Sequence, residues 1–129
     1  MTSRITQTLV LAIPRDEIYM TFLDGECISM FLGEPCLVER GEGARILPSS
    51  KRFEGEWLEC TPTERLRVQV QCHAEGFSTP LELIIYLEEI DDGTRVFFHT
   101  EGDPTHLRHW KEILSHYLID PLAEFFRDE

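Results

Sequence analysis

The sequence is poor in basic residues and lacks any long apolar run. Lysine and arginine together number 12 against 24 acidic residues, so the formal net charge at pH 7 is -12. Such a charge repels phosphate backbones and anionic lipid headgroups, and we therefore expect no nucleic-acid partner. No segment approaches the ~20 consecutive apolar residues that span a bilayer, so we also expect no membrane insertion.

The four cysteines are widely scattered, and no Cys-x-x-Cys pair occurs among Cys27, Cys36, Cys60 and Cys72. This spacing gives no indication of a zinc ribbon or a dithiol redox motif. The N-terminal stretch is interrupted by charge and proline, unlike a signal peptide. We therefore expect a cytoplasmic protein with reduced thiols that act as small core residues. A structural disulfide in a secreted domain stays open, because spacing alone does not decide pairing.

In its hydrophobic and charged fractions, the sequence is that of an ordinary globular protein. The 129 residues are 42% hydrophobic and 28% charged, close to globular averages. This length suits one domain, and the chain contains no internal repeat, linker or low-complexity tract. We therefore expect a single domain over residues 1–129.

The hydrophobic pattern predicts an α+β fold. Alternating apolar residues over 4–13 indicate a first strand, and residues 14–33 indicate two short helices, the second ending at Gly33. The Asp-Gly pair at positions 92 and 93 is typical of a β-hairpin. A loop is expected over 74–80, between the last of the middle strands and the hairpin. The further strands are predicted over 36–39, 44–47, 52–60, 65–73, 81–90 and 94–101.

From Pro104 onward the hydrophobic period changes to that of a helix. One broad apolar stripe contains Leu107, Trp110, Leu114, Tyr117, Leu118, Pro121, Leu122 and Phe125. Pro121 removes one helical hydrogen bond and crowds the preceding turn, which predicts a kink or break over 117–120.

This order of elements resembles the helix-grip arrangement of the START-like, or SRPBCC, superfamily. The most similar branch is that of homologues of the activator of the heat-shock chaperone ATPase. The resemblance is carried by residues 55–59, 62–66, 92–96 and 110–118, together with His99. It implies a curved antiparallel sheet of six to seven strands wrapped on the C-terminal helix, with a cavity between them. The tryptophan usual after the first helix is replaced here by Met30 and Phe31.

The resemblance implies that a small apolar or lipid-like molecule binds in this cavity. The predicted ligand-binding residues are Trp57, Tyr86, Phe98, Trp110, Lys111, Leu114, Tyr117 and Leu118. The alternative is that the aromatic members fill the core outright. Lys111 could aim its amine into the cavity mouth, but we favour a side chain that covers apolar surface and reaches water.

A second hypothesis is an enzyme of the cyclase or hydrolase type, since the superfamily hosts several activities on one scaffold. His99, Tyr86, Tyr117 and Lys111 would then supply acid-base groups, but no catalytic pair can be identified. By strand alternation, His99 shares a side with Phe97 and lies opposite Phe98, which favours a surface position. A third hypothesis, suggested by the branch alone, is a chaperone-activator-like interaction domain.

The C-terminal helix also raises the question of a metal site. His109, Glu112 and His116 share the helical face opposite the apolar stripe, where they would point at solvent and lack an ordered zinc motif. We therefore predict no metal and no other cofactor. Association through a sheet edge or a helix face leads us to expect a homodimer rather than a monomer.

Overall fold

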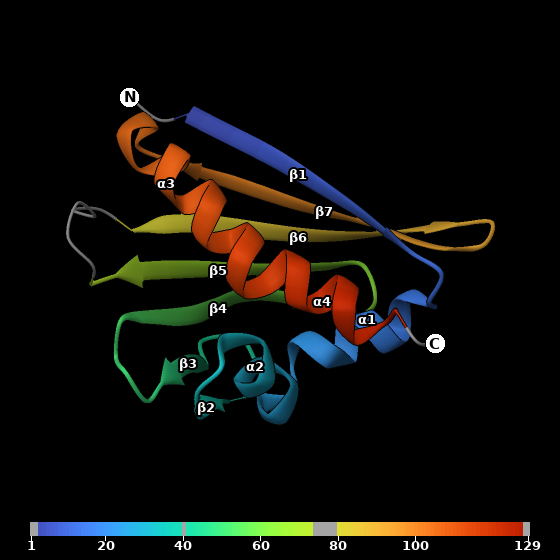
Figure 1. Cartoon of the computed structure of the whole chain (residues 1–129), viewed down its shortest axis with the longest axis horizontal. Coiled ribbons are helices and arrows are strands. Elements are labelled where there is room, and N and C mark those ends of the chain that lie inside the picture. Colours follow the sequence, from blue (N-terminus) through green and yellow to red (C-terminus); the bar gives the residue numbers. More distant parts are fainter. Residues whose placement is uncertain (1–2, 40, 74–79, 128–129) are drawn as a thin grey trace.

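One antiparallel sheet of seven strands organises the molecule (Figure 1). The structure, a computed structural model, describes residues 3–39, 41–73 and 80–127. The predicted loop over 74–80 therefore lies, apart from Pro80, outside the described residues. The strands follow the order β1-β7-β6-β5-β4-β3-β2 across the sheet. Their bounds are β1 Ser3–Leu11, β2 Cys36–Val38, β3 Arg45–Pro48, β4 Phe53–Thr61, β5 Arg65–Cys72, β6 Leu81–Ile90 and β7 Gly93–Gly102.

The first strand, β1, forms one edge of the sheet and pairs with the last strand, β7. β1 pairs with β7 from Ser3 opposite Gly102 to Leu11 opposite Thr94. The β6–β7 hairpin turns between Ile90 and Gly93, as the Asp-Gly signal predicts. Gly93 has a φ of 151°, and a Cβ atom there would collide with the carbonyl oxygen of Leu11. Glycine is therefore required for the hairpin to approach β1 this closely.

Two short helices follow β1, as predicted. α1 spans Arg15–Phe22 and α2 spans Gly25–Leu32. The carboxylate of Asp24 caps α2 by accepting a hydrogen bond from the backbone N–H of Glu26 at 2.9 Å. Gly33 ends α2 in the left-handed conformation, with a φ of 73°. These caps fix where α2 begins and ends beside the edge strand β2.

The C-terminal helix crosses one face of the sheet (Figure 1). Its winding changes along the way. It consists of α3 Pro104–Leu114, a π-helical segment η1 Ser115–Ile119, and α4 Asp120–Phe125. In η1 the backbone N–H of Asp120 donates to the carbonyl of Ser115, five residues earlier. The next residue is Pro121, which has no N–H to donate. The helix predicted to kink or break over 117–120 instead continues without a break, and the irregularity takes the form of a π turn over Ser115–Ile119.

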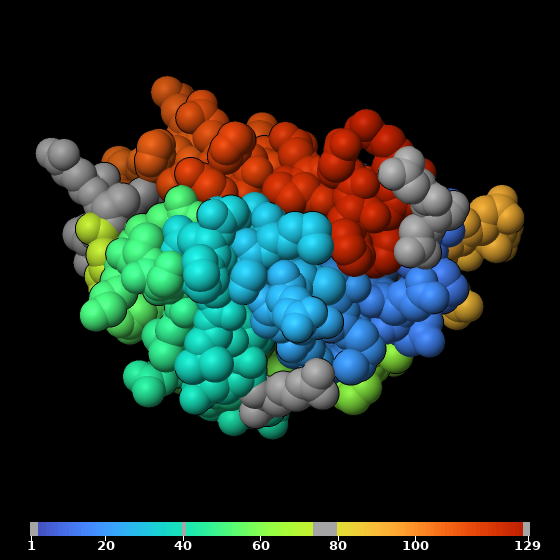
Figure 2. Space-filling model, turned by 60° about the horizontal axis from the view of Figure 1, so that its bottom comes forward, coloured from blue at the N-terminus to red at the C-terminus, as the bar shows by residue number. Residues whose placement is uncertain are grey.

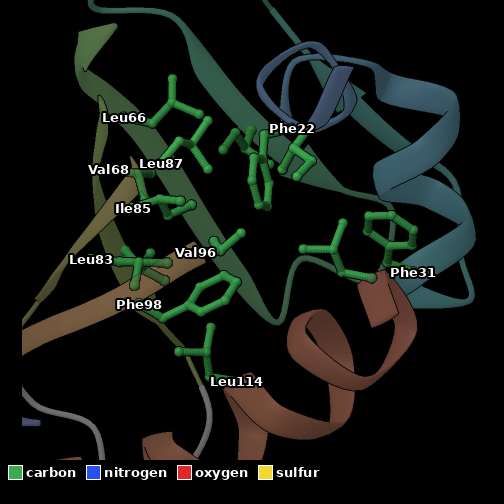
Figure 3. Packing of buried hydrophobic residues seen from close by; sticks show 14 of the residues in the cluster. Phe22, Phe31, Leu66, Val68, Leu83, Ile85, Leu87, Val96, Phe98 and Leu114 are labelled. Atoms are coloured by element: carbon green, nitrogen blue, oxygen red, sulfur yellow. The ribbon is translucent and has the colours of Figure 1, made fainter. Parts of the chain in front are cut away.

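The core lies between the inner face of the sheet and the helices. In Figure 3, Phe31 of α2 and Leu114 of α3 point toward the interior that Val68, Leu83 and Ile85 reach from the sheet. Alternate residues of β7, such as Val96 and Phe98, are fully buried, as the period of two predicts. The predicted fold class, an α+β helix grip, is confirmed.

A β-bulge in β4 determines which of its side chains face the C-terminal helix. The register with β5 shifts between Trp57 and Glu59, so that Leu58 is the extra residue. Before the bulge Gly55 and Trp57 face inward, and after it Cys60 pairs with the fully buried Leu66. Because of the bulge, Trp57 faces inward. Glu59 lies on the outer face, beside arginine side chains of β5.

Candidate ligand-binding site

An apolar pocket of about 420 Å³ lies between the sheet, α2 and the C-terminal helix. Its walls come from α1, α2, four strands and the helix segments α3 and η1. Figure 2 shows the surface on this side, where α1 and α2 (blue to cyan) lie against the C-terminal helix (orange to red). The lining residues are Phe22, Ile28, Phe31, Leu32, Ile46, Arg52, Phe53, Gly55, Trp57, Val68, Val70, Cys72, Leu83, Ile85, His109, Trp110, Ile113, Leu114, Tyr117 and Leu118.

Five of the residues predicted from sequence line this pocket. They are Trp57, Trp110, Leu114, Tyr117 and Leu118. Each stands on an inward position of β4 or of the C-terminal helix, where the period of the sequence indicates the buried side. The structure therefore brings these five side chains together, and their role in ligand binding stays a prediction.

Tyr86 lies on the opposite side of the sheet, which corrects its expected placement. Its neighbours Ile85 and Leu87 take the inward positions of β6, so Tyr86 points outward and is 38% exposed. There the guanidinium of Arg65 sits 5.8 Å from the centre of its ring. Arg65 also binds Glu59 at 2.6 Å, within a charged network of the outer face. Tyr86 cannot reach a molecule held against the inner face.

Phe98 and Lys111 also lie away from the pocket wall. Phe98 is fully buried, and its ring packs edge-on against Phe22 at 6.3 Å between centroids. It therefore belongs to the closely packed core. Lys111 is exposed on α3 and does not line the pocket. The structure favours the alternative in which this lysine reaches water.

The candidate acid-base groups do not converge. His99 faces outward, where its Nδ1 lies 2.9 Å from the hydroxyl of Thr6 and its Nε2 lies 3.5 Å from Glu101. With Tyr86 also outside, Tyr117 alone of the four candidates lines the pocket. Within the described ranges, no group of three or more His, Cys, Asp or Glu side chains is placed to hold a metal ion.

Sequence reasoning missed the pocket wall formed by the region after β1. Ile28, Phe31 and Leu32 of α2 line the pocket. Phe31 is 6% exposed, whereas its neighbour Met30 is 63% exposed. The ring of Phe31 also contacts Phe125 of α4 at 5.7 Å between centroids. Phe31 thus forms part of the pocket wall, and the helical period of α2 is the signal that could have identified it.

Arg52 is a further pocket residue that the sequence analysis did not identify. It immediately precedes β4, and its guanidinium stacks over the ring of Tyr117 at 4.3 Å. Its Nη2 donates to the carbonyl of Leu32 at 3.1 Å and lies 3.2 Å from the carboxylate of Glu34. One side chain thereby joins α2, the strand β4 and the π turn at the edge of the pocket.

The two tryptophans of the wall differ in their hydrogen bonding. Nε1 of Trp110 donates to the hydroxyl of Thr100 at 3.1 Å. Nε1 of Trp57 is buried and has no hydrogen-bond partner in the described part of the chain. Leaving a buried donor unpaired costs about 1–3 kcal/mol. The pocket side of the core thus contains one unsatisfied polar group.

The cysteines are not activated as nucleophiles. All four are free thiols. Burial raises the pKa of Cys72, which lines the pocket, to about 11. Burial is also the main cause that raises the pKa of Cys27, Cys36 and Cys60. Because the thiolate is the reactive form, these side chains act as neutral apolar groups at neutral pH.

Comparison with known proteins defines the class of fold. No protein-family model and no curated protein matches the sequence. Among solved structures, an HSP90 activator from Plasmodium falciparum, PFC0360w, matches with a TM-score of 0.73 and 13% identity, covering 93% of this chain and 92% of that chain. CalU16 from Micromonospora echinospora matches with a TM-score of 0.71 and 19% identity, covering 98% and 90%.

A third match is DynU16, a protein of the dynemicin biosynthetic locus. It gives a TM-score of 0.78 at 13% identity, covering 96% of this chain and 47% of DynU16. These identities are too low to transfer an activity. The likenesses show the fold alone: the chain shares its helix-grip fold with these three proteins. The described residues include no helix long and apolar enough to cross a membrane.

Proposed function

We propose that the domain binds a small apolar molecule in the pocket between its sheet and its C-terminal helix. The pocket itself is the observation that carries the proposal. Its volume of about 420 Å³ lies within the ~300–1,000 Å³ typical of small-molecule sites. Protein interiors are close-packed and leave few voids larger than a water molecule. A pocket of this size and apolar character is best explained by a molecule that fills it.

The chemistry of the walls favours a flat apolar ligand. Six aromatic side chains contribute to the lining, namely Phe22, Phe31, Phe53, Trp57, Trp110 and Tyr117. Aromatic faces offer large rigid contact areas. Burial of apolar ligand surface contributes roughly 25 cal/mol per Å². Binding of this kind needs no catalytic group.

The other two hypotheses have less support. An enzyme would require polar groups that converge in the pocket, and the candidate groups lie on different faces. A chaperone-activator role rests on the likeness to PFC0360w, and no residue of the pocket argues for it. DynU16, which has the same fold, is encoded in the dynemicin biosynthetic locus, and this setting supports a role that involves small molecules. A cytoplasmic location and a homodimer stay predictions from the sequence.

Native mass spectrometry of the protein as purified, followed by denaturing extraction, tests the proposal. We expect a bound molecule of defined mass that is released on unfolding. Both tryptophans of the chain line the pocket, so intrinsic fluorescence should change when the molecule is removed or replaced. The proposal fails if the protein carries nothing and a panel of lipids and aromatic polyketides leaves both its fluorescence and its melting temperature unchanged.

The variant Val70→Phe is the control for this experiment. Val70 lines the pocket from β5. A phenylalanine at this position would occupy part of the volume that the ligand needs. We expect the variant to fold and to copurify with little or no ligand. Equal occupancy in wild type and variant would place the bound molecule outside this pocket.

A further inference from the structure

Arg52 stands out among the residues that line the pocket. With histidine counted as neutral, it is the one formally charged residue in the described lining. Its side chain is 33% exposed, so it lies where the pocket meets solvent. A chain with a net charge of -12 thus places a cation at the mouth of an apolar site.

The guanidinium of Arg52 is held in position by the protein. Nη2 makes both the hydrogen bond to Leu32 and the ion pair to Glu34, and the ring of Tyr117 supports the guanidinium plane. Nε and Nη1 of Arg52 make no hydrogen bond to any of the described residues. Arginine carries five N–H donors, so fixed donors remain available at the pocket. Because they are already oriented, a ligand would lose little free energy in ordering them.

Glu34 determines whether the free N–H donors of Arg52 suit a charged or a neutral oxygen of the ligand. Its carboxylate accepts hydrogen bonds from the backbone N–H of Ser50, at 2.7 Å, and from Ser49. The hydrogen bond from Ser50 is the main cause that holds the pKa of Glu34 below its usual value. Glu34 is therefore ionised at neutral pH and already balances the charge of Arg52. A ligand carboxylate would add a second negative charge beside it, whereas a neutral oxygen would not.

We infer that the ligand is an uncharged, flat apolar molecule with a carbonyl or hydroxyl oxygen at one end, and that Arg52 donates a hydrogen bond to this oxygen at the pocket mouth. The inference rests on the proposed function of the pocket. It adds the orientation of the ligand, with its apolar body among the aromatic side chains and its oxygen beside Tyr117. Glu34 and Tyr117 act as positioning residues, since both contact the guanidinium of Arg52.

Three naphthalenes of similar shape test this inference by calorimetric titration: 2-acetylnaphthalene, 2-ethylnaphthalene and 2-naphthoate. We expect the ketone to bind more tightly than the carboxylate. In Arg52→Met we expect the ketone to lose about tenfold in affinity, the size of one hydrogen bond to a charged donor, while the hydrocarbon changes less than about twofold. Lys51→Met is the matched control, because the exposed neighbour removes the same charge and should leave all three affinities unchanged.

A spectroscopic measurement on the wild-type protein does not depend on the variant. The carbonyl stretch of isotope-labelled 2-acetylnaphthalene should lie at lower frequency in the complex than in hexane, because a hydrogen bond weakens the C=O bond. It should return toward the hexane value in Arg52→Met. An unshifted stretch in wild type overturns the inference.

The outcomes separate the inference from the proposed function. If no molecule copurifies and none of the three naphthalenes binds, the proposed function fails; if a molecule copurifies but none of the three binds, the inferred ligand class is wrong. If the hydrocarbon binds but Arg52→Met lowers its affinity as much as that of the ketone, the pocket binds ligands and the inference is wrong. If 2-naphthoate binds most tightly and loses most in Arg52→Met, the ligand is an acid and the uncharged class is overturned.

Discussion

The two sides of the sheet–helix interface differ in how they are filled. On the side of β1 and β7, hydrogen bonds tie the layers together: Trp110 donates to Thr100 at 3.1 Å, and Gln7 donates to Ser115 at 2.8 Å. On the side of β4 and β5, the pocket separates the sheet from α2 and η1. Trp110 stands at the boundary, because it belongs to the first side by its hydrogen bond and lines the second.

This difference explains how a small domain can keep an open pocket. The C-terminal helix is held to β1 and β7 by these hydrogen bonds, in addition to its contacts with Phe31 and Arg52 at the edge of the pocket. The π turn then brings Tyr117 and Leu118 over the open side, where Arg52 meets them. We therefore expect the side of β1 and β7 to provide most of the stability, and we propose that the side of β4 and β5 binds the ligand.

The largest expected effect comes from one substitution made on both sides. Val96 and Val70 both face inward, with exposures of 0% and 5%, but only Val70 lines the pocket. Val96→Phe should overpack the closed side and lower the free energy of unfolding by about 1–3 kcal/mol. Val70→Phe should lower it by less than about 1 kcal/mol, since the added ring enters the pocket. Urea denaturation measures both values.

Equal destabilisation by these two substitutions would contradict the difference between the two sides of the interface. It would mean that the pocket side is packed as closely as the side of β7. Probe binding gives an independent reading, because Val70→Phe should weaken 2-ethylnaphthalene binding while Val96→Phe, if folded, should not.

A second pair of substitutions compares the two tryptophans. Trp110→Phe leaves the buried hydroxyl of Thr100 without its donor, whereas Trp57→Phe removes an N–H that has no partner in the described chain. We expect Trp110→Phe to destabilise by about 1–3 kcal/mol more than Trp57→Phe. Thermal and urea unfolding of both variants measure the difference. A larger loss for Trp57→Phe would show that its N–H is satisfied in solution.

The third pair tests the π turn and has a smaller effect on stability. Alanine at position 121 restores a backbone N–H, which allows the helix to return to α winding and moves Tyr117 and Leu118 relative to the pocket. We expect a stability change of less than about 1 kcal/mol but a several-fold loss of probe affinity. Pro104→Ala is the control, because Pro104 opens α3, where an N–H has no helical acceptor. NMR shifts of Leu118 that stay unchanged in Pro121→Ala would contradict this assignment.

The last comparison concerns pH and the dryness of the pocket wall. The pKa of Cys72 is raised by burial from 9.0 to about 11, so the folded state holds this proton more tightly than the unfolded state. The resulting stabilisation is complete below about pH 9 and is lost as pH rises toward 11. Wild type should therefore lose stability over this interval more steeply than Cys72→Ala. Parallel curves for the two proteins would indicate a wall open to water.

Much of the fold could be predicted because its patterns are local. Strict alternation in β5 and β7, the Asp-Gly turn, Gly33 and Pro121 each act through their own segment of backbone. The same alternation also excludes Tyr86 from the inner face, because Ile85 and Leu87 take the inward positions of β6. Its expected place in the cavity was wrong for a reason that the sequence already contained.

The rest of the site could not be predicted because it forms between distant segments. Arg52 precedes β4, yet its partners are Leu32, Glu34 and Tyr117. No spacing in the sequence links these four residues. Phe98 faces inward as expected, but whether it lines a cavity depends on Phe22 of α1 packing over it. Pocket and filled core differ only in tertiary packing.

A crystal structure of the protein soaked with 2-acetylnaphthalene would show whether the pocket binds a flat apolar molecule. We expect density for the naphthalene rings between Trp57, Phe31 and Leu118, with Val96 and Phe98 packed as in the free protein. Density confined to other surfaces, with the side chains of β4, β5 and η1 closed over the pocket, would contradict it.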